Sequence, residues 1–345
     1  MEITRISTVA AFAMATMIST GATTIATAEE VDFSGKTITI VVGFGAGGGY
    51  DAYGRLAADH LGKHLEGNPT VIVENMPGGA GQRSAVYMAT AAPKDGTSIT
   101  VIPASIAFDA IRGGMASEIE PLAFRPIGRL TSIIEAQLTW HDSPTKTFED
   151  AQERETLVAG DGARGNASTV LSVMNARFGA KFNPVLGYKG TADMALAMER
   201  GEVEGIVHPL QTLDATHPDW VSENKVNFLW QQATARHPDY PEIPAIVEFA
   251  DDAEGKALLS LLASQGEIGR SLSAPPGTPP ETVEAFRAAF DAMIVDPDFI
   301  ADARTRNLPL DPATGEEVEA LIAATIESPA EVTAELNRIL EAVKE

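Results

Sequence analysis

The sequence predicts an α/β fold built around a mostly parallel β-sheet. Three short runs rich in apolar and β-branched residues, at 36–44, 69–75 and 97–105, alternate with segments of helical period. Parallel neighbours in a sheet need a long crossover connection, which is usually a helix. Each of the first two runs stops at a glycine cluster, where a chain commonly turns from a strand into a helix.

The periodicity of each segment predicts its structure. The run 36–44 is apolar over most of its length, so we expect a buried strand. The segment 50–67 is expected to be a helix with one apolar face, formed by Ala52, Leu56, Ala57, Leu61 and Leu65. A glycine turn opens the segment 76–96, and a second helix is expected to follow it.

The second half of the chain repeats the order of strand, glycine loop and helix. Residues 124–141 are expected to contain a strand, and another strand precedes the polar glycine loop 160–168. Residues 263–280 look like a strand that leads to a proline-rich turn. Four short helices are expected after it, one of them opened by Thr314 and Glu317 as a capping box.

Composition and charge limit the classes of function. The chain has 345 residues, 44% of them apolar, which is enough for a large core or for two lobes. Its formal net charge of −23 disfavours nucleic acid and anionic membranes as partners, because like charges repel. Cysteine is absent, which excludes disulfides, thiolate metal sites and cysteine nucleophiles.

The first residues are typical of a secretory signal peptide. Arg5 gives a short basic start, and an apolar stretch too short to span a bilayer follows it. Ala26, Thr27 and Ala28 form an A-x-A cleavage site. We therefore expect residues 1–28 to be removed and the mature protein to be exported and soluble. The alternative is a buried N-terminal helix.

The first glycine loop has the chemistry of an anion site. Gly43, Gly45 and Gly48 match the pattern G-x-G-x-x-G, and a helix is expected to start near Asp51. Free N–H groups and the positive end of the helix dipole would then face the loop. Asp51 itself is expected to cap the helix rather than to contact a ligand.

A dinucleotide site is the first alternative for this loop. Glu74 ends the second strand, about where an acidic residue would hold a ribose. However, the second glycine loop follows Glu74 directly, in the space that an adenosine would need, and a third lies at 160–168. Three small loops around one crevice favour a small ligand with several carboxylates, and no cofactor is expected.

Five segments, in order, resemble the solute-binding proteins of tripartite tricarboxylate transporters, called Bug proteins. The segments are ITIVVGFGAGGGYDAYGR, VIVENMPGGAGQRSA, AAPKDGTSI, GYKGTADMALAMERGEVEG and RHPDYPEIPAIVEFA. The second of them matches the most specific signature of that family, Val-Glu-Asn-x-Pro-Gly-x-x-Gly. The resemblance covers essentially the whole chain after the signal peptide.

The resemblance implies a two-lobed periplasmic-binding-protein fold of type II-like architecture. Mixed sheets flanked by helices would form each lobe, with a ligand cleft between the lobes. Lobe one is expected to comprise residues 29–131 and 264–345, and lobe two residues 132–263. Strands near Leu130 and near Gln265 would cross between them.

The resemblance also implies a function. The protein would be a monomer in the periplasm that captures a small di- or tricarboxylate or a related organic acid. It would deliver this ligand to the membrane permease subunits of a tripartite tricarboxylate transporter, without catalysis and without nucleic acid as a partner. Two alternatives remain open: a solute receptor for a sensor kinase, and an exported enzyme that uses the same cleft.

Departures from the family pattern bear on ligand choice. Ser168 stands where the family usually has histidine, and His208 where aspartate is common. Arg164 enters a loop that usually has small residues, and it would either project into solvent or hold a ligand carboxylate. Lys189 would be an anion ligand or part of an inter-lobe ion pair. The predicted ligand-binding residues are Gly47, Gly48, Gly49, Tyr50, Asp51, Gly78, Gly79, Ser105, Gly162, Arg164, Asn166, Ser168, Lys189 and His208.

One pair of histidines has a spacing that suits zinc. His60 and His64 stand four residues apart on a predicted helix, so both lie on one face. No third ligand is evident nearby in the sequence. We therefore interpret this face as solvent-exposed surface and predict no metal site.

Overall fold

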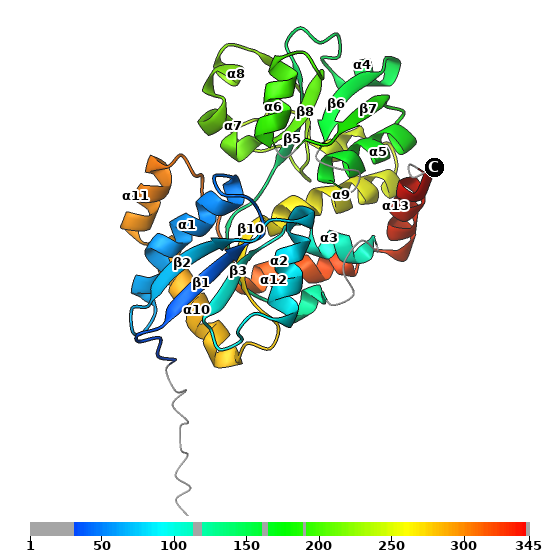
Figure 1. Cartoon of the computed structure of the whole chain (residues 1–345). Coiled ribbons are helices and arrows are strands. Elements are labelled where there is room, and N and C mark those ends of the chain that lie inside the picture. Colours follow the sequence, from blue (N-terminus) through cyan, green and yellow to red (C-terminus); the bar gives the residue numbers. More distant parts are fainter. Residues whose placement is uncertain (1–30, 113–118, 161–164, 189–190, 343–345) are drawn as a thin grey trace, which may run out of the picture.

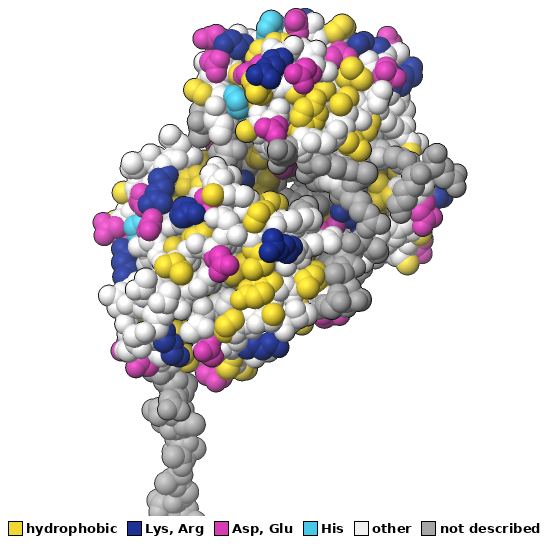
Figure 2. Space-filling view, viewed as in Figure 1, with side chains coloured by type: hydrophobic (Ala, Val, Ile, Leu, Met, Phe, Trp, Pro, Cys, Tyr) yellow, Lys and Arg dark blue, Asp and Glu magenta, His cyan; other side chains and the backbone are white. Residues whose placement is uncertain are grey.

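The computed structural model describes residues 31–112, 119–160, 165–188 and 191–342. It has two lobes, each built on one β-sheet with helices on its faces (Figure 1). Figure 2 shows that the molecule narrows between the two lobes. The predicted class, α/β with two mixed sheets flanked by helices, is confirmed.

The first sheet has six strands in the order β11-β4-β10-β3-β1-β2. Strand β1 pairs in parallel with both β2 and β3, whereas β10 runs antiparallel to β3 and β4. The strands are β1 Thr37–Val42, β2 Thr70–Asn75, β3 Ser98–Ile102, β4 Arg125–Thr131, β10 Arg270–Ala274 and β11 Ala313–Thr314. The three predicted N-terminal strands are therefore present and parallel.

The second sheet has five strands in the order β7-β6-β8-β5-β9. Strand β6 pairs in parallel with β7 and β8, and β5 runs antiparallel to β8 and β9. The strands are β5 Glu135–Trp140, β6 Thr156–Gly160, β7 Phe182–Leu186, β8 Gly205–Pro209 and β9 Val226–Gln231. The segment 124–141 thus forms two strands, one in each sheet.

Helices cover the sheets and bury their apolar faces. On helix α1, Leu56, Ala57 and Leu61 are fully buried, as the periodicity predicts. The α-helices are α1 Gly49–Leu61, α2 Gln82–Thr90, α3 Ile106–Ile111, α4 Phe148–Glu153, α5 Asn166–Phe178, α6 Thr191–Glu199, α7 Leu210–Thr216, α8 Pro218–Ser222, α9 Ala253–Ile268, α10 Pro280–Ile294, α11 Pro297–Thr305, α12 Gly315–Ile326 and α13 Ala330–Ala342. Short 3₁₀ turns are η1 Gly62–His64, η2 Gly79–Gly81, η3 Pro121–Ala123 and η4 Ile246–Phe249.

The predicted strand around Gln265 is wrong. Gln265 belongs to helix α9, and strand β10 begins only at Arg270. The helix persists because Leu258, Leu259 and Leu262, spaced at helical period, are buried in the core under the second sheet. Gly269, with φ +60°, ends it in a conformation that other residues rarely adopt.

One crossover between the lobes is held by helix α9. Ile133, in the link from β4 to β5, donates its backbone N–H to the carbonyl of Gly266 over 2.9 Å. The approach is so close that a Cβ at residue 266 would lie 2.1 Å from the Ile133 carbonyl oxygen. Gly266 is therefore the residue that lets the helix and the crossover touch.

The C-terminal helix packs beside the second sheet. Leu336 and Ile339 of α13 share a buried cluster with Leu171 of α5 and Leu258 of α9. Phe108 of α3 joins the same cluster. The assignment of residues 264–345 to lobe one remains a proposal. Within this range, α13 packs against α5, which belongs to the predicted lobe two.

The predicted signal peptide, residues 1–28, lies outside the described residues. Within the described ranges, the helices are all too short or too polar to cross a bilayer.

Candidate functional site

Three loops gather at one edge of the first sheet. Strands β1, β2 and β3 are parallel, so their carboxyl ends and the loops that follow lie together. The chain leaves β1 for β2 on one side and returns to β3 on the other. Such a reversal of strand order opens a crevice at the carboxyl edge, where α/β proteins commonly bind ligands. In the second sheet, β7, β6 and β8 have the same arrangement.

The first glycine loop leads into helix α1. Gly48 is the N-cap and provides no side-chain hydrogen bond to the first turn, so those N–H groups remain for another acceptor. A Cβ on Gly48 would meet only the Gly45 carbonyl oxygen, at 3.6 Å. Gly47, with φ +83°, needs glycine for its backbone conformation. The loop therefore combines a tight turn with an open helix end.

Asp51 closes this loop. Its carboxylate accepts hydrogen bonds from Gly47 N, Arg55 Nε and Asn75 Nδ2, each over 2.9 Å. Burial opposes ionisation, but these donors, led by the Arg55 guanidinium, outweigh it and hold the pKa of Asp51 below its ordinary value. Asp51 thus orders the loop rather than capping the helix directly, and it is not positioned as a ligand for an anion.

Tyr50 joins the first loop to the third. Its hydroxyl accepts a hydrogen bond from Ala104 N over 3.1 Å, and its ring stacks on Phe44 at 4.1 Å between centroids. Ser105 is next in the chain, where its hydroxyl donates to Asp109 Oδ2 over 2.9 Å. The structure therefore brings Tyr50 and Ser105 to the same edge of the sheet.

The second glycine loop follows β2. Gly78 has φ +146° and Gly79 has φ +57°, so both positions favour glycine. The 3₁₀ turn η2 leads directly into α2. The predicted residues of the first lobe therefore lie on three neighbouring loops, although their contact with a ligand remains a prediction.

The lobe-two residues are only partly described. Gly162, Arg164 and Lys189 lie outside the described residues. Asn166, the first residue of α5, exchanges two side-chain hydrogen bonds with Gln232, over 3.0 and 3.2 Å. Ser168, in the first turn of the same helix, is buried. Asn166 and Ser168 thus stand at the N-terminal end of α5.

His208 lies at the carboxyl end of β8, but its side chain packs inside lobe two. It is 2% exposed, with Nδ1 2.9 Å from the Pro209 carbonyl oxygen and Nε2 3.3 Å from Thr216 Oγ1. Burial lowers the pKa of His208 to about 4, so it is neutral at neutral pH. Among the described residues, the imidazole contacts Pro209 and Thr216 and not the glycine loops.

Sequence analysis missed one residue at the first loop, Arg270. This residue is 3% exposed and lies at the start of β10, next to the N-terminal end of α1. Its guanidinium carbon is 5.6 Å from the ring centroid of Tyr50 and 5.0 Å from that of Tyr53. The signal in the sequence was a lone arginine opening an otherwise uncharged strand.

The interpretation of His60 and His64 as solvent-exposed surface is wrong. Their side chains are 12% and 18% exposed, and their Nε2 atoms lie 2.9 Å from Asp302 Oδ2 and 3.1 Å from Asp296 Oδ2, respectively. His60 thus links α1 to α11, and His64 of η1 lies against the residue that precedes α11. Over the described ranges, no group of three or more potential ligands could hold a metal ion.

A separate cavity of about 420 Å³ lies beside the crossover. Ile133, Gln232 and Gly266 are among the residues that line it. None of the eleven predicted ligand-binding residues that the structure describes is among its lining residues.

Two lobes, each with a reversal of strand order at a loop-bearing sheet edge, define the class of periplasmic binding proteins. Solved structures of this class share the fold. A Rhodopseudomonas palustris protein with bound malate, MatC, has a TM-score of 0.63 at 21% identity, over 89% of this chain and 100% of that one. An R. palustris protein with adipate has a TM-score of 0.67 at 18% identity, over 90% and 99%.

The family is shown by sequence. Residues 54–336 match the tripartite tricarboxylate transporter family receptor, TctC. A "UPF0065 protein in gbd 5'region" of Cupriavidus necator is 26% identical over 289 residues, which is 79% of each chain. The chain belongs to the TctC receptor family, the solute-binding proteins that the sequence motifs resemble.

Proposed function

We propose that this protein captures a small organic carboxylate in the periplasm and delivers it to the membrane permease of a tripartite tricarboxylate transporter. The ligand would lie between the lobes, against the three loops of the first sheet and the N-terminal end of α5. Membership of the receptor family supports solute binding, and the acids named for the two structural neighbours support the ligand class.

The observation that carries this proposal is the open first turn of α1. Its N–H groups face the glycine loop, and the Gly48 position leaves room for a ligand to approach the main chain. A helix N-terminus favours carboxylate oxygens through both its free donors and its dipole. Asp51 is already occupied by three donors, so its charge does not fill this position.

A thermal-shift screen tests the proposal. The mature chain is mixed with malate, adipate, citrate and aromatic acids, and with the corresponding amides as uncharged controls. Ligand at 100 times its dissociation constant should stabilise the folded state by about 2.7 kcal/mol. Stabilisation by an acid but not by its amide supports the proposal, whereas no stabilisation by any acid contradicts it.

Two further measurements separate the alternatives. An exported enzyme would convert the bound compound, so recovery of unchanged ligand after prolonged incubation argues against catalysis. A receptor for a sensor kinase would bind the ligand equally well but would not be needed for uptake. Loss of ligand uptake by cells that lack this protein therefore supports delivery to a permease.

A further inference from the structure

Arg270 is the most buried arginine of the described chain. Two other described arginines are also buried, and Arg270 differs from them in its partners. Arg129, 8% exposed, binds the carboxylate of Asp311 and the carbonyl of Glu267. Arg287, also 8% exposed, binds Glu316 and Glu319. In Arg270, by contrast, Nε and Nη1 are buried without any hydrogen-bond partner.

The side chains around Arg270 provide no hydrogen bond to its Nε and Nη1. The pKa values of Tyr50 and Tyr53 are raised, mainly by burial, so both phenols are neutral. Their rings offer cation–π attraction, but this leaves the N–H groups unbonded. Glu135 also acts electrostatically on Tyr50, yet no ion pair between Glu135 and Arg270 is found in the part of the chain that the structure describes.

The lack of hydrogen-bond partners for this guanidinium is unusual because of where Arg270 lies. Its Nη2 lies so close to Gly49, the first residue of α1, that a Cβ there would be 2.5 Å away. A cation at a helix N-terminus opposes the helix dipole, which favours anions at that end. A buried charge without a partner is also costly. Both costs fall when one anion contacts the guanidinium and the first turn of α1 together.

We propose that Arg270 is the fixed cation of the binding site and pairs with a carboxylate of the ligand at the N-terminus of α1. This inference rests on the proposed function, because it assigns one residue to the same site. The guanidinium would donate to the carboxylate oxygens, which would also accept from the free N–H groups of the helix. Gly49 is required because only a missing side chain admits the guanidinium.

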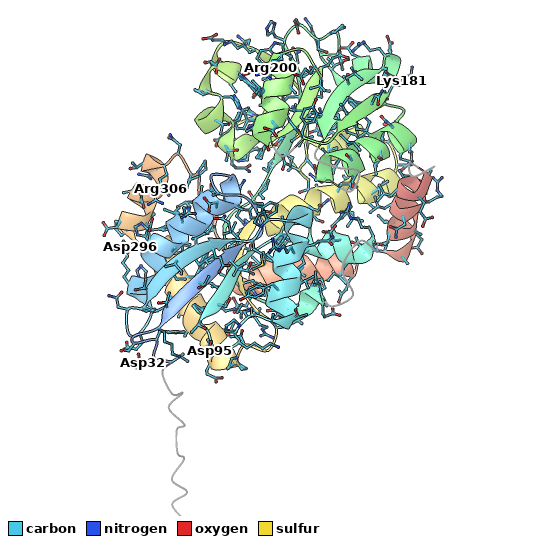
Figure 3. All side chains as sticks on the ribbon, in the orientation of Figure 1. Asp32, Asp95, Lys181, Arg200, Asp296 and Arg306 are labelled. Carbon is cyan, nitrogen blue, oxygen red and sulfur yellow. The ribbon has the colours of Figure 1, made fainter. Side chains whose placement is uncertain are left out.

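Charged side chains elsewhere have other surroundings. Lys181, Arg200, Asp296 and Arg306 lie on the outer parts of the lobes in Figure 3, and Arg306 there binds Asp59 and Asp302. Because the protein has a net charge of −23, its excess of carboxylates repels an anionic ligand. A buried cation at the sheet edge supplies local attraction without a basic surface.

The test is calorimetry on Arg270→Met and Arg270→Lys with malate and adipate as probes. Arg270→Met removes the charge but keeps an unbranched chain, so we expect at least tenfold weaker binding, equivalent to about 1.4 kcal/mol. The melting temperature without ligand should be unchanged or higher, because an unpaired buried charge is removed. Arg270→Lys should recover part of the affinity, since it keeps the charge but not the planar fork.

Two controls sharpen the result. Arg338→Met removes the same charge from an exposed arginine that binds Glu335 three residues away, and it should leave affinity unchanged. Gly49→Ala keeps Arg270 but crowds its guanidinium, and it should weaken binding of the same probes. If Arg270→Met does not fold, Arg270→Lys and Gly49→Ala decide the question.

The outcomes are distinct. Monoamides of the probes should bind the parent weakly but should lose little more in Arg270→Met, because the two changes remove one interaction. Parent-like affinity in Arg270→Met, with a lower melting temperature, would show a purely structural arginine and overturn this inference while the proposed function stands. Failure of the parent to bind any carboxylate overturns both proposals.

Discussion

His208 shows how a single residue can combine a predicted position with a different role. Its main chain is the last but one position of β8, while its imidazole packs near Trp220, with ring centroids 6.1 Å apart. From the family resemblance, His208 is predicted to contact the ligand. Burial among apolar neighbours instead makes this histidine a neutral core residue whose protonation opposes folding.

The pH dependence of stability tests this interpretation. The pKa of His208 is about 4 in the folded protein and near 6.5 when unfolded, so the unfolded chain binds the extra proton first as the pH falls. Stability should therefore be full above about pH 6.5 and decline toward pH 4, by up to about 3 kcal/mol. His208→Gln should remove much of this slope in urea unfolding at pH 7.5 and 4.5. An unchanged slope would assign it to other groups, such as His217, whose pKa burial also lowers.

Gly48 offers a residue-scale test of the anion site. Its φ of −82° is compatible with alanine, unlike that of Gly79, so Gly48→Ala should fold with a cost below about 1 kcal/mol. The added methyl group should obstruct the first-turn N–H groups of α1 and weaken ligand binding. Gly45→Ala is the matched control, because a Cβ there meets no atom within 4 Å. Equal affinities of the two variants would argue against ligand approach at Gly48.

At the scale of elements, local sequence signals predict some helices correctly and others not. The capping box of Thr314 and Glu317 is present as predicted at the start of α12. The sequence predicts a strand, not helix α9, around Gln265, because Gly266 in the last turn and Gly269 at the C-cap are typical of breaks in a helix. Contact with the crossover, not helix propensity, requires Gly266.

A glycine-to-alanine exchange in α9 tests that requirement. Alanine usually stabilises a helix interior by about 0.5–1 kcal/mol over glycine. At residue 266 we expect the opposite, a lower free energy of unfolding, because the new Cβ would lie 2.1 Å from the Ile133 carbonyl oxygen. Gly255→Ala, in the same helix, would meet its nearest atom at 3.1 Å and should cost less. Urea unfolding of both variants measures the difference.

At the scale of the whole molecule, contacts between residues join the lobes in addition to the segments of chain that cross between them. Arg112, at the C-cap of α3, donates to Thr169 Oγ1 of α5 over 3.0 Å, and Asn337 of α13 donates to the Ile111 carbonyl over 3.3 Å. Phe108 is buried in the cluster that contains α5 and α9. These contacts lie on one side of the molecule, so closure over a ligand should be a rotation that keeps this side together.

Distance measurements between labelled lobes test closure. Because the chain has no cysteine, cysteines introduced at Arg83 in α2 and Leu186 at the end of β7 can be labelled uniquely. Both side chains are exposed. Saturating ligand should shorten their separation and narrow its distribution. A pair within the first lobe, Arg83 and Asp95, should not change. No change in the first pair at saturation would contradict closure but not binding.

Patterns local in sequence determined much of this protein. The β-branched runs and glycine clusters predicted three parallel strands and their loops, and the apolar period of α1 predicted its buried face, because strand and helix burial repeat every few residues. The five matching segments likewise predicted the family and the two-lobed class. Strand and helix patterns and sequence motifs each involve residues that are close together in the sequence.

Tertiary structure decided the contacts between residues far apart in sequence. Arg270 reaches Gly49 and Tyr50 only because β10 enters the first sheet beside β3, more than 200 residues after α1. No periodicity in the sequence predicts that a buried guanidinium there lacks a carboxylate partner among the described residues. His208 similarly turned inward because α7 and α8 cover it. Burial and pairing are set by packing in three dimensions, which the order of residues specifies only through the complete fold.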